Sequence, residues 1–258
     1  DIVDIDITVE KKDYAYGKVK KYISCSDSRV EVKCPSFVAE IPCGGCDWLM
    51  LKYSEQLKQK NQLLLELFSP FIDKALIYFP APSPQIKHYR NKVFMPVGKN
   101  IQTGKITFGM YARFSHQIVE HITCENHPPI FDQLANSLME FCLKAKVEPY
   151  NEIEHRGQLR YIGFRCNSDG SQILVILVTL SGKLPFTNLL VKKLTTEFSP
   201  IKGIIQNINR QKGNVILGKE TKLLYGSENL YDNLCGLKFR VNYRSFWQIN
   251  TGTMEMII

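Results

Sequence analysis

The sequence predicts an α+β fold in which pairs of strands alternate with helices. Short apolar runs, of which residues 173–178 are the longest, are typical of buried strands. Apolar residues at helical spacing follow Ser54, and they recur after Pro128 and Pro129. With 258 residues, of which 44% are hydrophobic and 22% charged, the chain is long enough to bury a core of its own.

The N-terminal stretch predicts two strands. Ile2, Ile5, Ile7 and Val9 mostly alternate with polar residues, and Gly17 opens a second, basic strand after a turn. Two strands do not close a barrel. A hairpin that packs on the next domain is one expectation for them.

A helix is expected to begin at Ser54, whose hydroxyl is placed to cap it, and to end at Ser69 and Pro70. Residues 80–84, PAPSP, predict a rigid connector. The apolar face of this helix is formed by Leu57, Leu63, Leu64 and Leu67.

The remainder of the chain continues the alternation of strands and helices. A helix beginning near Pro128 and Pro129 is expected to bury Ile130, Phe131, Leu134, Leu138, Phe141 and Cys142. A further helix is expected over residues 186–198. Strands are expected at residues 89–97, 106–113, 160–166, 172–180, 203–209, 214–218 and 237–241. The longest apolar run is far shorter than the ~20 residues that a membrane-spanning helix needs, so no membrane partner is predicted.

Four cysteines predict a metal centre: Cys34, Cys43, Cys46 and Cys124. A C-x-x-C pair allows two thiolates to reach one centre from a single turn, and the intervening Gly44 and Gly45 permit positive φ angles and close backbone approach. Such a site would join two distant parts of the chain.

A local zinc site is the alternative. It would use Cys25 with Cys34, Cys43 and Cys46, and further possible ligands are His116, His121 and His127. Eight cysteines in 258 residues are too few to indicate a disulfide framework. Cys142, Cys166 and Cys235 stand singly among apolar residues and are expected to be buried.

The charge distribution points to RNA. The formal net charge is +8 with a pI near 9.0, and no Asp or Glu occurs from Lys74 to Val119. Arg90, Lys92 and Arg113 lie in this stretch with aromatic residues between them, a combination that suits phosphates and unpaired bases. A solvated basic face is the alternative explanation.

Four segments in chain order extend these indications: CPSFVAEIPCGGCDWLMLKYSEQLKQKNQLL, YRNKVFMPVG, GMYARFSHQIVEHITC and LYGSENLYDNLCGLKFRVNYRSFWQIN. Together they resemble the RNA uracil-5-methyltransferase family. The resemblance covers nearly the whole chain, and CGGC and SFWQIN are specific when they occur in this order. It implies a four-iron, four-sulfur (4Fe-4S) cluster on Cys34, Cys43, Cys46 and Cys124.

The resemblance also implies a domain order. Residues 1–33 would be part of an OB-like, TRAM-type RNA-binding barrel, residues 34–244 a mixed α/β iron-sulfur and RNA-binding domain, and residues 245–258 the truncated start of a Rossmann-like methyltransferase domain. The sequence has no glycine-rich cofactor turn of its own. The nucleophilic cysteine and the general base are therefore expected beyond Ile258.

In such an enzyme a thiolate adds to C6 of the target uracil, C5 takes the methyl group of S-adenosylmethionine, and a base removes the C5 proton. The resemblance implies that Gln248 contacts S-adenosylmethionine, and it makes Phe246 and Trp247 candidates for stacking on the cofactor or on the flipped RNA base. The alternative for either ring is packing in a core at the end of a strand. The expected protein is a cytoplasmic, monomeric enzyme that makes 5-methyluridine in rRNA or tRNA. The alternative is a non-enzymatic iron-sulfur or zinc RNA-binding module, and an electron-transfer module is a third class.

Overall fold

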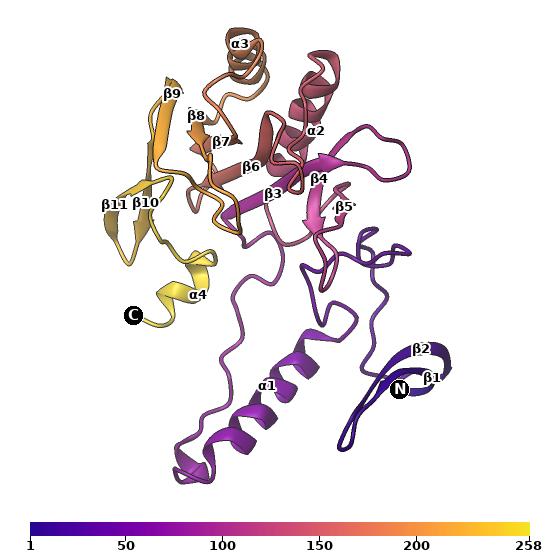
Figure 1. Cartoon of the computed structure of the whole chain (residues 1–258). Coiled ribbons are helices and arrows are strands. Elements are labelled where there is room, and N and C mark those ends of the chain that lie inside the picture. Colours follow the sequence, from indigo (N-terminus) through magenta and orange to yellow (C-terminus); the bar gives the residue numbers. More distant parts are fainter. The chain divides into compact units, whose positions relative to one another are not determined.

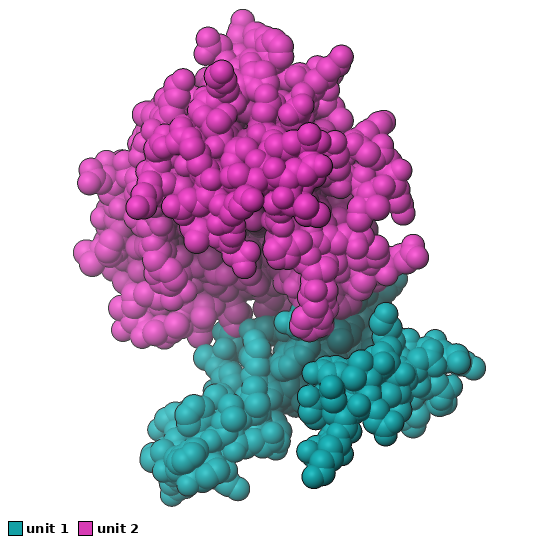
Figure 2. Space-filling view, viewed as in Figure 1, with its two compact units in different colours: residues 1–33, 47–82 teal, residues 34–46, 83–258 magenta.

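The computed structural model describes residues 1–258, which divide into two compact units. Unit 1 comprises residues 1–33 and 47–82, and unit 2 comprises residues 34–46 and 83–258 (Figure 2). The domain boundaries expected after residues 33 and 244 remain predictions. No helix of the chain is long and apolar enough to span a membrane.

Unit 1 contains the predicted hairpin and the first helix. Strands β1 (Ile2–Glu10) and β2 (Ala15–Ser24) pair antiparallel, and almost all of their side chains are exposed. Helix α1 (Tyr53–Phe68) is followed by a short 3-10 turn, η1 (Lys74–Leu76).

One expectation about α1 was wrong. Ser54 lies inside the helix and not at its cap, since Lys52 precedes the first turn and no side chain caps it. The apolar face of α1 is mostly open, because Leu57 alone is buried while Leu63 and Leu67 are 51% and 56% exposed.

Unit 2 is built on a seven-stranded mixed sheet with the order β5-β4-β3-β6-β7-β8-β9 (Figure 1). All neighbouring strands are antiparallel except β7 and β8, which are parallel and are joined through a helix. The strands are β3 (Lys92–Lys99), β4 (Ile106–Tyr111), β5 (Ile118–Glu120), β6 (Leu159–Cys166), β7 (Ile173–Thr179), β8 (Ile201–Ile208) and β9 (Glu220–Gly226).

One face of this sheet carries the main core. Helix α2 (Pro129–Lys144) and helix α3 (Thr187–Glu197) both pack there. Phe131, Leu134 and Leu138 of α2 are at most 1% exposed and contact the central strands, as the helical spacing predicts. Proline at the first position of α2 starts the helix without losing a hydrogen bond.

The opposite face holds a second core cluster under the hairpin of β10 (Asn229–Leu234) and β11 (Leu237–Asn242). Leu230, Val241 and Tyr243 pack there against Leu174 and Ile176 of β7. A short helix, α4 (Thr251–Glu255), ends the described fold.

The strand expected at residues 214–218 does not form. Amide side chains take the backbone acceptors that a neighbouring strand would need: Asn209 Nδ2 donates to the carbonyls of Val215 and Ile216, and Asn207 Nδ2 donates to that of Gly218. The strands actually formed beside this segment, β9 and β10, were not expected from the sequence.

Candidate functional site

The four predicted ligands Cys34, Cys43, Cys46 and Cys124 line a single cavity of about 80 Å³ in unit 2. Three of them come from residues 34–46, which precede the sheet. The fourth follows β5 at the sheet edge. Folding therefore brings together cysteines that lie up to ninety positions apart in the sequence.

The Cys43-Gly44-Gly45-Cys46 turn is fastened to the edge of β4. The Gly44 amide donates to the Tyr111 carbonyl at 2.9 Å, and Cys43 forms a β-bridge with Ala112. A Cβ on Gly44 would lie 2.8 Å from the Tyr111 oxygen, so close approach requires glycine there. The expected positive φ is wrong for both glycines, since neither has one.

Cys124 lies in a segment of seven residues, His121 to His127, that is tied to the first turn of α2. Asp132 Oδ1 accepts from Nε2 of both His121 and His127 at 2.7 Å, and Oδ2 accepts from Thr123 Oγ1 at 2.9 Å. Burial alone would raise the pKa of Asp132, but the hydrogen bonds from the two imidazoles outweigh it and hold that pKa well below its usual range.

The sulfur atoms receive hydrogen bonds from the same segment. Asn126 Nδ2 donates to Cys46 Sγ at 3.2 Å, and the backbone amides of Asn126 and His127 donate to the Cys124 sulfur. Burial raises the pKa of the Cys124 and Cys43 thiols, and the nearby sulfurs act in the same direction. Thiols whose pKa values are raised by mutual proximity gain most from a metal that neutralises their charge.

The structure contains a group of possible metal ligands whose atoms all lie within 4.8 Å of one another, namely His121, His127 and Asp132. The four cysteines share a cavity but do not form such a group.

Of the alternative ligands, His121 and His127 line the same cavity, whereas Cys25 and His116 do not. Cys25 is exposed and belongs to unit 1. His116 is exposed and contacts Glu152, while His121 and His127 direct Nε2 at Asp132. Among the other cysteines, Cys142 and Cys166 are buried as expected, but Cys235 is exposed, so its predicted burial was wrong.

The three predicted RNA-binding cations occupy different environments. Arg90 is half-buried and lines the cysteine cavity. Lys92 is half-buried over the Phe94 ring, and burial together with the neighbouring Arg165 lowers its pKa. Arg113 is exposed, and its Nη2 donates to the Cys46 carbonyl at 2.7 Å.

The SFWQIN segment forms a loop between β11 and α4 that is fixed by buried polar side chains. Arg165 Nη1 donates to the carbonyls of Asn242 and Ser245, each at 2.8 Å. Asn91 binds the loop further along, because its Nδ2 donates to the Gln248 carbonyl at 2.9 Å. The role of Arg165 and Asn91 could not be predicted from the sequence, because it depends on neighbours that only folding brings to them.

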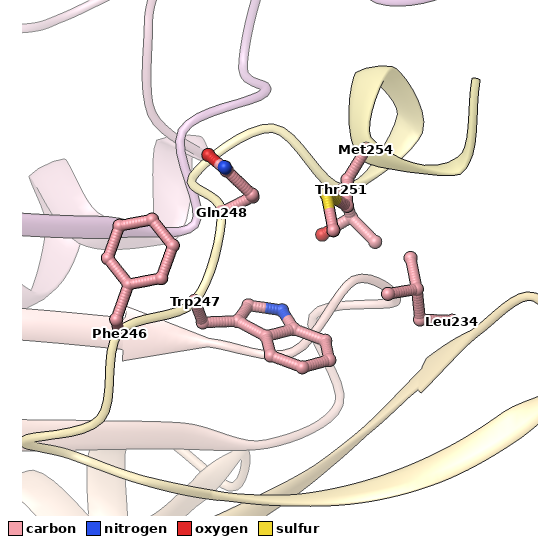
Figure 3. Close-up of a pocket in the computed structure, with 6 residues that line it drawn as sticks. All are labelled: Leu234, Phe246, Trp247, Gln248, Thr251 and Met254. Carbon is pink, nitrogen blue, oxygen red and sulfur yellow. The ribbon is translucent and has the colours of Figure 1, made fainter. Parts of the chain in front are cut away.

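Two rings of this loop differ in their surroundings. Phe246 is 83% exposed, whereas Trp247 packs on the second core cluster and its Nε1 donates to the buried Asp232 at 3.0 Å. In Figure 3 the indole points toward Leu234 and α4, and the amide of Gln248 points away from it. Both rings and Gln248 line a pocket of about 90 Å³. Trp247 is therefore an anchor of the loop, and Phe246 is the ring that remains open to a ligand.

Comparisons with known proteins identify relatives over almost the whole chain. A protein of Clostridium tetani described as an uncharacterized RNA methyltransferase is 34% identical over 264 residues, which cover 99% of this chain and 55% of the relative. A protein of Oceanobacillus iheyensis with the same description is 31% identical and covers 95% of this chain and 53% of the relative. The chain belongs to this RNA methyltransferase family.

The fold of the chain agrees with that of a solved structure. The Pyrococcus abyssi tRNA (uracil-54, C5)-methyltransferase in complex with S-adenosyl-L-homocysteine matches with a TM-score of 0.73 at 21% identity, over 98% of this chain and 55% of that one. No protein-family model matches the chain. The chain spans about half the length of the curated relatives it matches.

Proposed function

We propose that the whole protein is an S-adenosylmethionine-dependent RNA methyltransferase that acts on C5 of a uridine in rRNA or tRNA, and that this chain supplies RNA binding and a 4Fe-4S cluster. The observation that carries the proposal is the convergence of Cys34, Cys43, Cys46 and Cys124 on one cavity, in a chain that RNA methyltransferases match over 99% of its length. The fold shared with a uracil-C5 enzyme supports the choice of base and of methyl donor.

The residues of the cavity suit an iron-sulfur cluster. Four thiols that line one cavity are the donors that such a cluster requires. When bound, the cluster would cross-link the turn at Cys46 to the segment at Cys124. Arg113 contacts the carbonyl of Cys46 and Arg90 lines the cavity, so the same cross-link would fix two of the cations proposed to meet RNA.

Gln248 is the residue proposed to contact S-adenosylmethionine. Its main chain is held by Asn91 while its side chain is exposed, so the amide is free to offer a donor and an acceptor to the charged amino-acid part of the cofactor. Phe246, which is exposed beside it, is the ring proposed to stack on the target base.

The metal content tests the first part of this proposal. The chain purified without oxygen is expected to contain about four irons and equivalent sulfide. Cys124→Ser should lose the cluster and Cys25→Ser should keep it, because only the former removes a cavity residue. Stoichiometric zinc without sulfide would exclude the cluster.

Methyl transfer tests the enzymatic part and separates it from a non-enzymatic RNA-binding module. The full-length protein should transfer label from S-adenosylmethionine to C5 of uridine. Gln248→Ala should raise the dissociation constant of the cofactor roughly ten- to a hundredfold, as the loss of an amide contact predicts. Gln133→Ala, at an exposed position of α2, is the matched control. Equal cofactor affinity in the two variants would remove Gln248 from the cofactor site.

RNA binding is tested by salt titration. Each lost phosphate contact should flatten the dependence of the logarithm of the binding constant on that of the salt concentration by roughly 0.7 for a single strand. Replacement of Arg90, Lys92 and Arg113 by glutamine should therefore weaken binding and flatten this slope. An unchanged slope would show that none of the three cations contacts RNA phosphates.

A further inference from the structure

The carboxylate of Asp132 binds four groups of one short segment. Its Oδ1 atom accepts hydrogen bonds from His121 and His127, and its Oδ2 atom accepts from the Thr123 hydroxyl at 2.9 Å and the Cys124 amide at 3.4 Å. Asp132 stands in the first turn of α2, whose buried face packs in the main core. The carboxylate thus connects the segment from residue 121 to 127 to a rigid helix.

The same segment provides the hydrogen bonds that reach the cysteine sulfurs. Asn126 donates its side-chain amide to Cys46 Sγ at 3.2 Å, and the backbone amides of Asn126 and His127 donate to the Cys124 sulfur. Its outer side is also held, because the Arg90 amide donates to the Asn126 carbonyl at 2.8 Å. A shift of this segment would therefore displace the proposed ligand Cys124. It would also displace the hydrogen-bond donors to two sulfurs, those of Cys46 and Cys124.

The cluster of His121, His127 and Asp132 has the composition of a metal site, and its ligand atoms lie within 4.8 Å of one another. The geometry is nevertheless that of hydrogen bonds. Both imidazole Nε2 atoms stand 2.7 Å from the same oxygen, and the other oxygen already has two donors. An ion placed there would have to replace four hydrogen bonds. We therefore interpret these groups as a structural connection between the segment and the helix, and not as a second metal site.

We propose that Asp132 is a positioning residue of the cysteine site, which holds Cys124 and the amide of Asn126 in place for a metal centre bound by the four thiolates. The role depends on the proposed cluster. Outer-shell groups of this kind orient ligands and slow the loss of the metal, and their removal typically costs ten- to a hundredfold in metal affinity.

Asp132→Asn is the test with the least change in shape. The amide oxygen can still accept from both imidazoles, but the amide nitrogen that replaces Oδ2 cannot accept from the Cys124 backbone. With the cluster in place, iron release to a chelator in the absence of oxygen should be about ten- to a hundredfold faster than in the wild type. Glu140→Gln is the matched control, because Glu140 is an exposed carboxylate on the same helix.

The thermal midpoint of the metal-free protein separates positioning from a general loss of stability. Because it loses hydrogen bonds, Asp132→Asn should lower the midpoint of both forms, but its lowering relative to Glu140→Gln should be larger with metal than without it. Thr123→Val, at an exposed position, removes one bond to Oδ2 and should give a smaller acceleration even if Asp132→Asn does not fold.

Three results would overturn the proposal. Equal iron release from Asp132→Asn and Glu140→Gln would refute the positioning role while leaving the cluster intact. If Asp132→Asn lowered the thermal midpoint of the metal-free protein as much as that of the metal-bound protein, Asp132 would stabilise the fold without a specific role at the cysteine site. A wild-type chain that takes up no iron would refute both the cluster and the role of Asp132.

Discussion

The hydrogen bond between Trp247 and Asp232 is expected to anchor the loop that carries Gln248, and a double-mutant cycle can measure it. Asp232 is 2% exposed and accepts from four donors: the amide and hydroxyl of Ser168, the amide of Asn233 and the indole Nε1 of Trp247. The variants are Asp232→Asn, Trp247→Phe and the pair.

The expected magnitudes follow from these contacts. A hydrogen bond to a charged group contributes about 1.5–3 kcal/mol, and Trp247→Phe removes one such bond while keeping an aromatic ring against Phe239. Asp232→Asn turns the acceptor of the indole into a donor. The double variant should therefore be less destabilised than the sum of the single variants by about 1.5–3 kcal/mol.

Urea unfolding followed by circular dichroism gives the four free energies of unfolding. Trp247→Phe combined with Glu140→Gln is the control cycle, because α2 packs on the opposite face of the sheet. The control should add within about 0.5 kcal/mol. A coupling of that small size between Asp232 and Trp247 would refute the anchor, and it would return the indole to the candidates for ligand stacking.

Three further outcomes are expected. Leu134→Ala, at a position with no exposed surface, should lower the free energy of unfolding by about 2–5 kcal/mol. Leu143→Ala, at a residue of α2 that is 46% exposed, should change it by no more than about 0.5 kcal/mol. Equal effects of the two variants in urea unfolding would contradict the packing of this helix. Burial raises the pKa of the Cys142 thiol to about 12 from 9.0, so above pH 9 only the unfolded thiol ionises and this group should lower stability by about 1.4 kcal/mol per pH unit. When unfolding is measured from pH 8 to 10.5, the slope for Cys142→Ala should be shallower than that of the wild type by this amount, and the remaining slope includes the contribution of Cys166, whose pKa burial also raises to about 12. Gly44→Ala should cost about 1–3 kcal/mol and speed iron release, because its Cβ would press on the Tyr111 carbonyl; iron release at the wild-type rate would show that the turn can shift without disturbing the site.

Elements with strong local signals could be predicted from the sequence. The helix after Pro129 and the strand through residues 173–178 carry their periodicity and boundaries in a few adjacent residues. The four candidate ligands could also be proposed from the sequence, since a C-x-x-C pair with two glycines is typical of a metal site.

Other structural features depend on side-chain contacts that the local sequence pattern does not reveal. The segment 214–218 has the apolar pattern of a strand, but asparagine side chains of the preceding residues bind its carbonyls and prevent pairing. The apolar spacing of α1 predicts an apolar face but not what covers it, and most of that face is exposed.

The sequence by itself determined the α+β class, the four candidate ligands and the family, because local periodicity and short motifs carry this information. The tertiary structure alone showed that the distant Cys124 shares a cavity with Cys34, Cys43 and Cys46, and that the Trp247 indole binds the buried Asp232. It also revealed Asp132, Asp232 and Arg165 as the groups that hold the candidate sites in place. The physical reason is that a buried charged group is tolerated only where folding gathers its hydrogen-bond partners, and those partners come from segments that no local pattern connects.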